Sequence, residues 1–222
     1  MIRARFEQQL AELRDDILRM GKMVEDQLLL AIQALDTLDV KLAQQVNTAD
    51  IAVNKLRFDT EEKCFTLIVT QQPAARDLRA VVSVMNIIVD LERMGDQSKG
   101  IAKVIPHLHQ QTKPVLLPEL KQMGDLVISM LRQTMQAYAS DSVTLARIVC
   151  AQDSDVDKLY AQVFAKLINQ MADDNLAEEI ESSYERLRVA RELERFGDLS
   201  TNIAERVIYR VTGELKELNT DG

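Results

Sequence analysis

Apolar residues recur at steps of three and four along most of the chain, the spacing that places them on one buried face of an α-helix. Between about 4 and 34 this pattern is carried by Leu10, Leu13, Ile17, Met20, Val24, Leu28 and Ala31. The same spacing predicts further helices at about 40–69, 74–106, 119–138, 142–171 and 177–212. The predicted fold class is therefore all-α, with six long helices.

Short turns separate the predicted helices. Asp39 ends the turn at 36–39 and can cap the helix that follows. Pro73 disfavours the helical conformation in the residue before it, so the second helix is expected to end near Gln71. Gly213 is well placed to stop the last helix. Because turns this short require neighbouring helices to run antiparallel, each group of three is expected to form an up-down-up bundle.

The longest break in the helical pattern is HLHQQTKPVLLP at 107–118, which directly follows Pro106. Prolines mark loops, so this segment is interpreted as a linker. It separates a first three-helix repeat at 1–106 from a second at 119–222. His107 and His109 are expected to lie in this solvated loop, and a metal site there is the less favoured interpretation.

The second half of the chain repeats the first. Asp50 matches Asp153, for example, after a shift of 103 positions. The first-half residues that recur at this shift are Met20, Gly21, Val24, Gln33, Ala34, Val40, Leu42, Ala43, Val46, Asp50, Val53, Lys55 and Leu56. The shift then becomes 102, where DLERMGDQSKGIA at 90–102 matches ELERFGDLSTNIA at 192–204. Such self-similarity indicates a duplicated structural unit, so the predicted architecture is two tandem three-helix bundles.

Composition narrows the classes of function. The 222 residues carry a formal net charge of −8, with 27 Lys and Arg scattered among 35 Asp and Glu, so nucleic-acid binding is not expected. No apolar run approaches the roughly 20 residues needed to cross a bilayer. The start MIRARFEQQL also lacks the apolar stretch of a signal peptide. We therefore expect a cytoplasmic protein without direct membrane insertion. Cys64 and Cys150 are expected to be buried free thiols.

Acidic side chains four positions apart recur in the second and third helix of each predicted bundle. Residues at this spacing project from one face of a helix. The pairs are Glu92 with Asp96, Glu194 with Asp198, Asp153 with Asp157, and Asp50 with Asn54. Antiparallel packing of the two helices would bring two pairs together at the rim of a groove in each bundle. Gly95 and Gly197, inside the repeated phrase, indicate either a close backbone approach or room for an ion.

Two interpretations of these acids remain open. Acids four apart are common on solvated helix faces, where a like-charge pair costs only about 0.2–0.5 kcal/mol. Their recurrence in both halves instead favours a metal site built from oxygen ligands. Because no histidine or thiolate accompanies them, hard ions are expected, with Fe(III) as the first choice and Mn, Mg or Ca as alternatives. The sequence has no Glu-x-x-His pair of the kind that ferritin-like di-iron sites use.

These motifs resemble those of the PhoU family of phosphate-signalling and phosphate-transport regulators, and the resemblance covers essentially the whole chain. It rests on the repeated phrase at 90–102 and 192–204 and on QQPAARDLR at 71–79. It also rests on Asp50 and Asp153, each followed by a hydrophobic core residue and then, five positions after the acid, by Lys-Leu. The resemblance implies paired three-helix bundles in a cytoplasmic, often dimeric protein.

The resemblance also implies metal clusters bound by Glu/Asp-x-x-x-Asp motifs. In this sequence the matching pairs are Glu92 with Asp96, Glu194 with Asp198, and Asp153 with Asp157. The fourth pair departs from the pattern, because Asn54 stands beside Asp50 where the family has an acid. The first cluster is therefore expected to be weaker or to differ in metal number.

The resemblance further implies a negative regulator of phosphate-starvation responses. Such a protein contacts a membrane sensor histidine kinase and the ATPase subunit of a phosphate ABC transporter, and it reaches the inner membrane only through these partners. Nothing in the sequence resembles a nucleophile with its base, which favours a non-catalytic adaptor. The alternatives are a carboxylate-bridged metal-dependent phosphohydrolase, since adjacent hard ions activate water and bind phosphate, and a metal-free helical scaffold.

Overall fold

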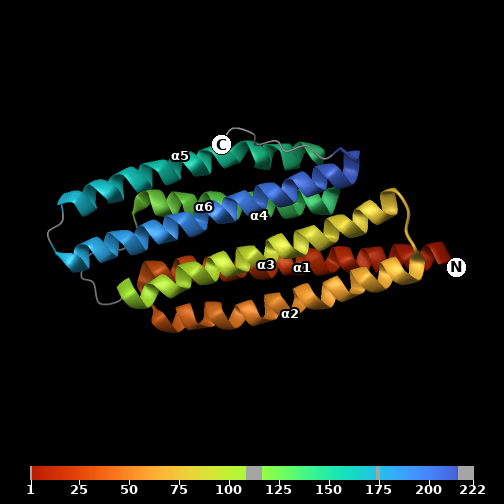
Figure 1. Ribbon diagram of the computed structural model, residues 1–222, viewed down its shortest axis with the longest axis horizontal. Helices are drawn as coiled ribbons and strands as arrows, with labels where there is room; N and C mark the ends of the chain where they lie inside the picture. Colours follow the sequence, from red (N-terminus) through yellow and green to blue (C-terminus); the bar gives the residue numbers. More distant parts are fainter. Residues whose placement is uncertain (1, 109–116, 174–175, 215–222) are drawn as a thin grey trace.

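The computed structural model describes residues 2–108, 117–173 and 176–214, and within these ranges it contains six helices and no strand. The helices are α1 (Ile2–Thr37), α2 (Val40–Gln71), α3 (Arg76–Leu108), α4 (Pro118–Ser140), α5 (Val143–Asp173) and α6 (Ala177–Thr212). Figure 1 shows α1 to α3 in one half of an elongated molecule and α4 to α6 in the other. In each half every helix packs against the other two. The predicted architecture of two three-helix bundles is confirmed.

Two of the predicted helix boundaries are confirmed, the start of α2 at Asp39 and the end of α6 at Gly213. The Asp39 carboxylate accepts hydrogen bonds from the backbone N–H groups of Lys41 at 2.7 Å and Leu42 at 3.2 Å, which caps the start of α2. Gly213 follows α6 with a φ of 82°, a left-handed conformation that glycine adopts without a steric penalty. Its N–H donates to the Tyr209 carbonyl at 2.9 Å.

The linker begins and ends differently from the prediction. Helix α3 continues through Pro106 to Leu108, so His107 is an exposed residue of the last helical turn and not part of a loop. Proline removes one helical N–H, but the fully buried Leu108 side chain stabilises this turn by packing. Pro118 lies inside α4 at its first position, where its missing N–H costs nothing. His109 lies outside the described residues.

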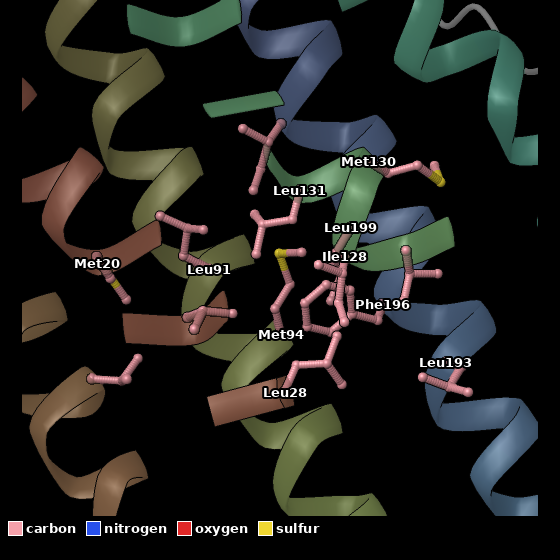
Figure 2. Packing of buried hydrophobic residues seen from close by; sticks show 14 of the residues in the cluster. Met20, Leu28, Leu91, Met94, Ile128, Met130, Leu131, Leu193, Phe196 and Leu199 are labelled. Atoms are coloured by element: carbon pink, nitrogen blue, oxygen red, sulfur yellow. The ribbon is translucent and has the colours of Figure 1, made fainter. Parts of the chain in front are cut away.

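One hydrophobic core joins the two repeats. Helix α3 packs along α6, and α1 packs along α4, so the buried side chains of all six helices form a single cluster. Figure 2 shows residues of both repeats gathered in this core, among them Leu28 and Met94 from the first and Ile128 and Phe196 from the second. We therefore expect the two repeats to depend on each other for stability.

Matched glycines allow α1 and α4 to approach closely. A Cβ atom added at Gly124 of α4 would lie 2.8 Å from the Cδ1 atom of Ile32 in α1. A Cβ at Gly21 of α1 would collide with the side chain of Met135 in α4. Gly21 precedes Gly124 by 103 positions, and Ile32 precedes Met135 by the same number. The two contacts are therefore equivalent, which gives the pairing of the repeats an approximate two-fold symmetry.

Candidate metal centre

The acids of the second repeat lie on two packed helices, α5 and α6. Asp153 and Asp157 come from α5, whereas Glu194 and Asp198 come from α6. The Glu194 Oε1 atom accepts a hydrogen bond from the Arg191 Nη1 atom at 2.8 Å. Its other oxygen, Oε2, is buried and has no hydrogen-bond partner among the described residues. A buried carboxylate oxygen without a donor is costly, and a cation would satisfy it.

Mutual repulsion among these four acids is visible in their electrostatics. The pKa of Asp198 is raised to about 7, first by partial burial and then by the carboxylates of Glu194, Asp153 and Asp157, while Arg191 opposes the shift. The pKa of Glu194 is also raised, first by burial and then by Asp157 and Asp153, while Arg191 opposes the shift. The carboxylates of the two helices therefore influence one another, and their convergence on a common ion stays a prediction. Both side chains hold their charge at an energetic cost that a bound cation would reduce.

The four acids influence one another electrostatically without forming a coordination shell. Within residues 2–108, 117–173 and 176–214 no three His, Cys, Asp or Glu side chains are arranged so that they could hold a metal ion. Asp157 is exposed, and Asp198 keeps an accessible surface although neighbouring side chains partly cover its carboxyl group, so both can turn toward an ion without disturbing the core. The donor set, four carboxylates without nitrogen or sulfur, suits a hard cation.

The matching residues of the first repeat are arranged differently. The Asp50 side chain is buried between α2 and α3, and its Oδ2 atom accepts hydrogen bonds from Lys99 Nζ at 2.6 Å and Asn54 Nδ2 at 3.0 Å. The same Lys99 ammonium donates to Asp96 Oδ1 at 3.1 Å. Hydrogen bonding to Asp50 is the main cause that raises the pKa of Lys99, which keeps this side chain charged. Asp50 and Asp96 are thus joined by a lysine.

Glu92 completes the predicted first-repeat set on the same face of α3. Burial is the main cause that raises its pKa, and the carboxylates of Asp96 and Asp50 add to the shift. The guanidinium groups of Arg57 and Arg93 oppose it. In this repeat Lys99 therefore contacts two of the acids, and Arg57 and Arg93 act on the third.

Lys99 was not singled out by the sequence patterns, although a signal for it was present. In the repeated phrase Lys99 follows Asp96 by three residues, where Thr201 follows Asp198 in the second copy. The acid is the same in both repeats, but the residue three positions after it is basic in the first and neutral in the second. This difference indicates that the local charge of the two sites differs. The contact between Lys99 and Asp50 could not be predicted without the packing of α2 against α3, because the two residues are 49 positions apart.

The two repeated glycines differ in how closely neighbouring side chains approach them. A Cβ atom added at Gly95 would lie 3.1 Å from the Oε1 atom of Gln27 and 3.4 Å from the Oδ1 atom of Asp50. A Cβ at Gly197 would lie 3.4 Å from both methyl carbons of Val156. Both glycines are buried and face the neighbouring helices. A close contact therefore explains Gly95, whereas at Gly197 a Cβ atom would make ordinary van der Waals contacts.

The two cysteines take no part in the site. Cys64 and Cys150 are buried and free, as predicted. Burial is the main cause that raises the pKa of each thiol to about 12. Protonated, buried thiols are poor metal ligands, so the acids provide the chemistry of this candidate site.

Comparison with known proteins decides the family. The model of the PhoU domain matches residues 17–105 and again residues 120–207, one match for each repeat. The chain belongs to the PhoU family. A phosphate-specific transport system accessory protein PhoU homolog of Clostridium acetobutylicum is 36% identical over 220 residues, covering 99% of this chain and 100% of the relative. The resemblance drawn from the repeated motifs is therefore confirmed.

Solved structures of PhoU proteins share the fold. The crystal structure of the phosphate transport system regulatory protein PhoU from Streptococcus pneumoniae matches with a TM-score of 0.89 and 33% identity, covering 96% of this chain and 100% of that one. PhoU from Pseudomonas aeruginosa matches with a TM-score of 0.89 and 34% identity, covering 94% and 100%. Among the described residues of this PhoU-family chain, no helix is long and apolar enough to cross a membrane.

Proposed function

We propose that this PhoU-family chain is a non-catalytic regulator of phosphate uptake that binds a hard metal ion at the acids of its second repeat. Its relatives are named as accessory or regulatory proteins of phosphate transport, and this chain covers their full length or nearly so. Coverage of this extent supports a shared role. In this proposal the protein works in the cytoplasm and restrains the phosphate-starvation response when phosphate is plentiful.

The proposal of metal binding is supported by the charges of the acidic side chains on α5 and α6. Glu194 and Asp198 both have raised pKa values with neighbouring carboxylates among the causes, and the buried Glu194 Oε2 atom has no hydrogen-bond partner. A bound Fe(III), Mn²⁺, Mg²⁺ or Ca²⁺ ion would supply positive charge to both helices. The four acids would hold the ion and fix the position of α5 against α6.

The proposed partners are a membrane sensor histidine kinase and the ATPase subunit of a phosphate ABC transporter, and we propose that the chain also forms a homodimer. An apolar surface suited to protein contacts is present on α2. Its exposed residues Ile51, Phe58, Phe65 and Val69 lie along the helix at steps of seven, seven and four, each with more than half of its surface accessible. Exposed apolar stripes of this kind commonly mark protein interfaces.

Complementation in cells from which the gene has been deleted tests the regulatory function. Deletion is expected to raise expression of a high-affinity phosphate transporter in phosphate-rich medium, and the wild-type gene is expected to restore repression. A gene carrying Glu194→Gln and Asp198→Asn is expected not to restore it, although the protein accumulates normally. The measurement is transporter transcript level together with the rate of phosphate uptake.

A matched variant controls for loss of negative charge. Glu12→Gln with Asp15→Asn removes two exposed acids from α1, in the other repeat. This variant is expected to restore repression as well as wild type. Unchanged phosphate uptake after deletion of the gene would contradict the regulatory function. Full repression by the Glu194 and Asp198 variant would show that regulation does not need the metal centre.

A further inference from the structure

The two repeats carry different chemistry at one matched position beside their acids. Lys99 in α3 and Thr201 in α6 occupy the same place in the repeated phrase, 102 positions apart. The Lys99 ammonium contacts Asp50 of α2 and Asp96 of α3, so it joins two helices. Thr201 instead donates a neutral hydrogen bond to Asp153 Oδ1 at 3.2 Å. One repeat has a cation at this position and the other has a hydroxyl group.

Lys99 lies where a metal ion of the first repeat would have to bind. A metal held by Asp50 and Asp96 would sit against an ammonium that already contacts both carboxylates, and two cations in contact repel strongly. Asn54 also provides an amide where the second repeat has the carboxylate of Asp157. The first repeat therefore offers three carboxylates, two of them joined by an ammonium. The second offers four carboxylates and a hydroxyl, and its Arg191 guanidinium contacts one of these acids, Glu194.

The packing explains why the first repeat needs an internal cation. The side chain of Asp50 is only 5% exposed, and its Oδ1 atom is buried without a hydrogen-bond partner among the described residues. A buried carboxylate without a nearby positive charge is strongly destabilising. The Lys99 ammonium supplies this charge from within the chain.

We propose that Lys99 is the built-in cation of the first repeat, so that this chain takes up its hard metal ion in the second repeat alone. The ammonium ties α2 to α3 as a metal ion would tie α5 to α6. The metal part of this inference rests on the proposed metal-binding function, whereas the role of Lys99 rests on its own contacts. In this proposal the link between α2 and α3 is permanent, whereas the link between α5 and α6 depends on the supply of metal.

Exchange of the differing residues between the repeats tests where metal binds. Protein stripped with a chelator is dialysed against MnCl₂, and bound manganese is measured by elemental analysis. Glu194→Gln with Asp198→Asn is expected to abolish binding, and adding Lys99→Thr with Asn54→Asp to that variant is expected to restore it. In an otherwise wild-type chain, Glu92→Gln with Asp96→Asn is expected to change the Mn²⁺ dissociation constant by less than about 2-fold.

Two results of this exchange would overturn the proposal. The first is a loss of bound manganese when only Glu92 and Asp96 are changed. The second is a failure of Lys99→Thr with Asn54→Asp to restore binding in a chain whose circular dichroism matches wild type. Both concern metal content and not activity, so they are independent of the regulatory readout.

A second measurement tests Lys99 without any metal. In chelator-treated protein, Lys99→Met removes the ammonium but keeps most of the side-chain length, and it is expected to lower the melting temperature by about 4–12 °C. The control is Lys158→Met, which breaks an exposed ion pair with Asp155 at 2.8 Å. This control is expected to lower the melting temperature by less than about 3 °C.

The melting data separate this inference from the proposed function. If Lys99→Met melts like the control, Lys99 is not the internal cation and the inference is overturned. If wild-type protein binds no Mn²⁺ while Lys99→Met melts early, the metal-binding function is overturned and the structural role of Lys99 is supported.

Discussion

Replacement of Glu194 by glutamine together with Asp198 by asparagine is expected to raise the dissociation constant for Mn²⁺ by roughly 100-fold or more, a loss of about 2.7 kcal/mol. These substitutions keep the size of both side chains but remove two of the four carboxylate charges that α5 and α6 carry at the candidate site. Affinity for a hard cation depends on the number of charged ligands. The measurement is calorimetric titration of chelator-stripped protein with MnCl₂.

The Glu12→Gln and Asp15→Asn variant is the matched control for this titration. It removes the same amount of charge from the exposed surface of α1, and we expect a dissociation constant close to that of wild type. The Glu194 and Asp198 variant should melt no lower than wild type in metal-free buffer, because neither side chain belongs to the hydrophobic core and their neutralisation removes mutual repulsion. Equal Mn²⁺ affinity in both variants would place the metal elsewhere.

Phe196→Ala is expected to lower the free energy of unfolding by about 3–5 kcal/mol and the melting temperature by about 6–20 °C. Phe196 is fully buried in the core that joins the repeats, so truncation leaves a cavity in a region shared by both. Because α3 packs on α6 and α1 on α4, we expect the whole chain to unfold in one transition. Differential scanning calorimetry measures both the midpoint and the number of transitions.

The exposed residue Phe65 supplies the control for this substitution. Its side chain lies on the surface of α2, and Phe65→Ala is expected to change the free energy of unfolding by no more than about 0.5 kcal/mol. If Phe196→Ala instead produced two transitions, with only the second-repeat transition shifted, the repeats would be independent folding units and the shared core would not couple them.

The fold was largely predictable because local signals and the duplication agree with the packing. The apolar spacing located all six helices, and Asp39 and Gly213 mark helix ends that the structure confirms. The end of α3 was misplaced, since Pro106 interrupts a helical pattern that burial of Leu108 nevertheless extends. Such a tertiary contact cannot be read from local preference. The joining of the repeats into one core also lay beyond what the periodicity could predict.

The spacing of the acids was enough to select them as candidate site residues. The charged side chains around them could not be predicted in the same way. Identical spacing in both repeats predicted two similar clusters, with Asn54 as the one visible difference. The structure shows that Lys99 contacts Asp50 across α2 and α3, and the sequence alone gives no measure of such a contact. It also shows that Gly95 lies in close contact with Gln27 of α1. Side-chain direction at a helix crossing depends on tertiary geometry and not on the motif.

Anomalous X-ray diffraction from crystals grown with MnCl₂ tests the central claim most directly. The claim predicts a manganese peak between α5 and α6, with carboxylate oxygens of Glu194 and Asp198 within about 2.5 Å of the ion. It predicts no peak beside Lys99. Manganese bound elsewhere in the crystal, with these four acids making no contact to it, would contradict this assignment.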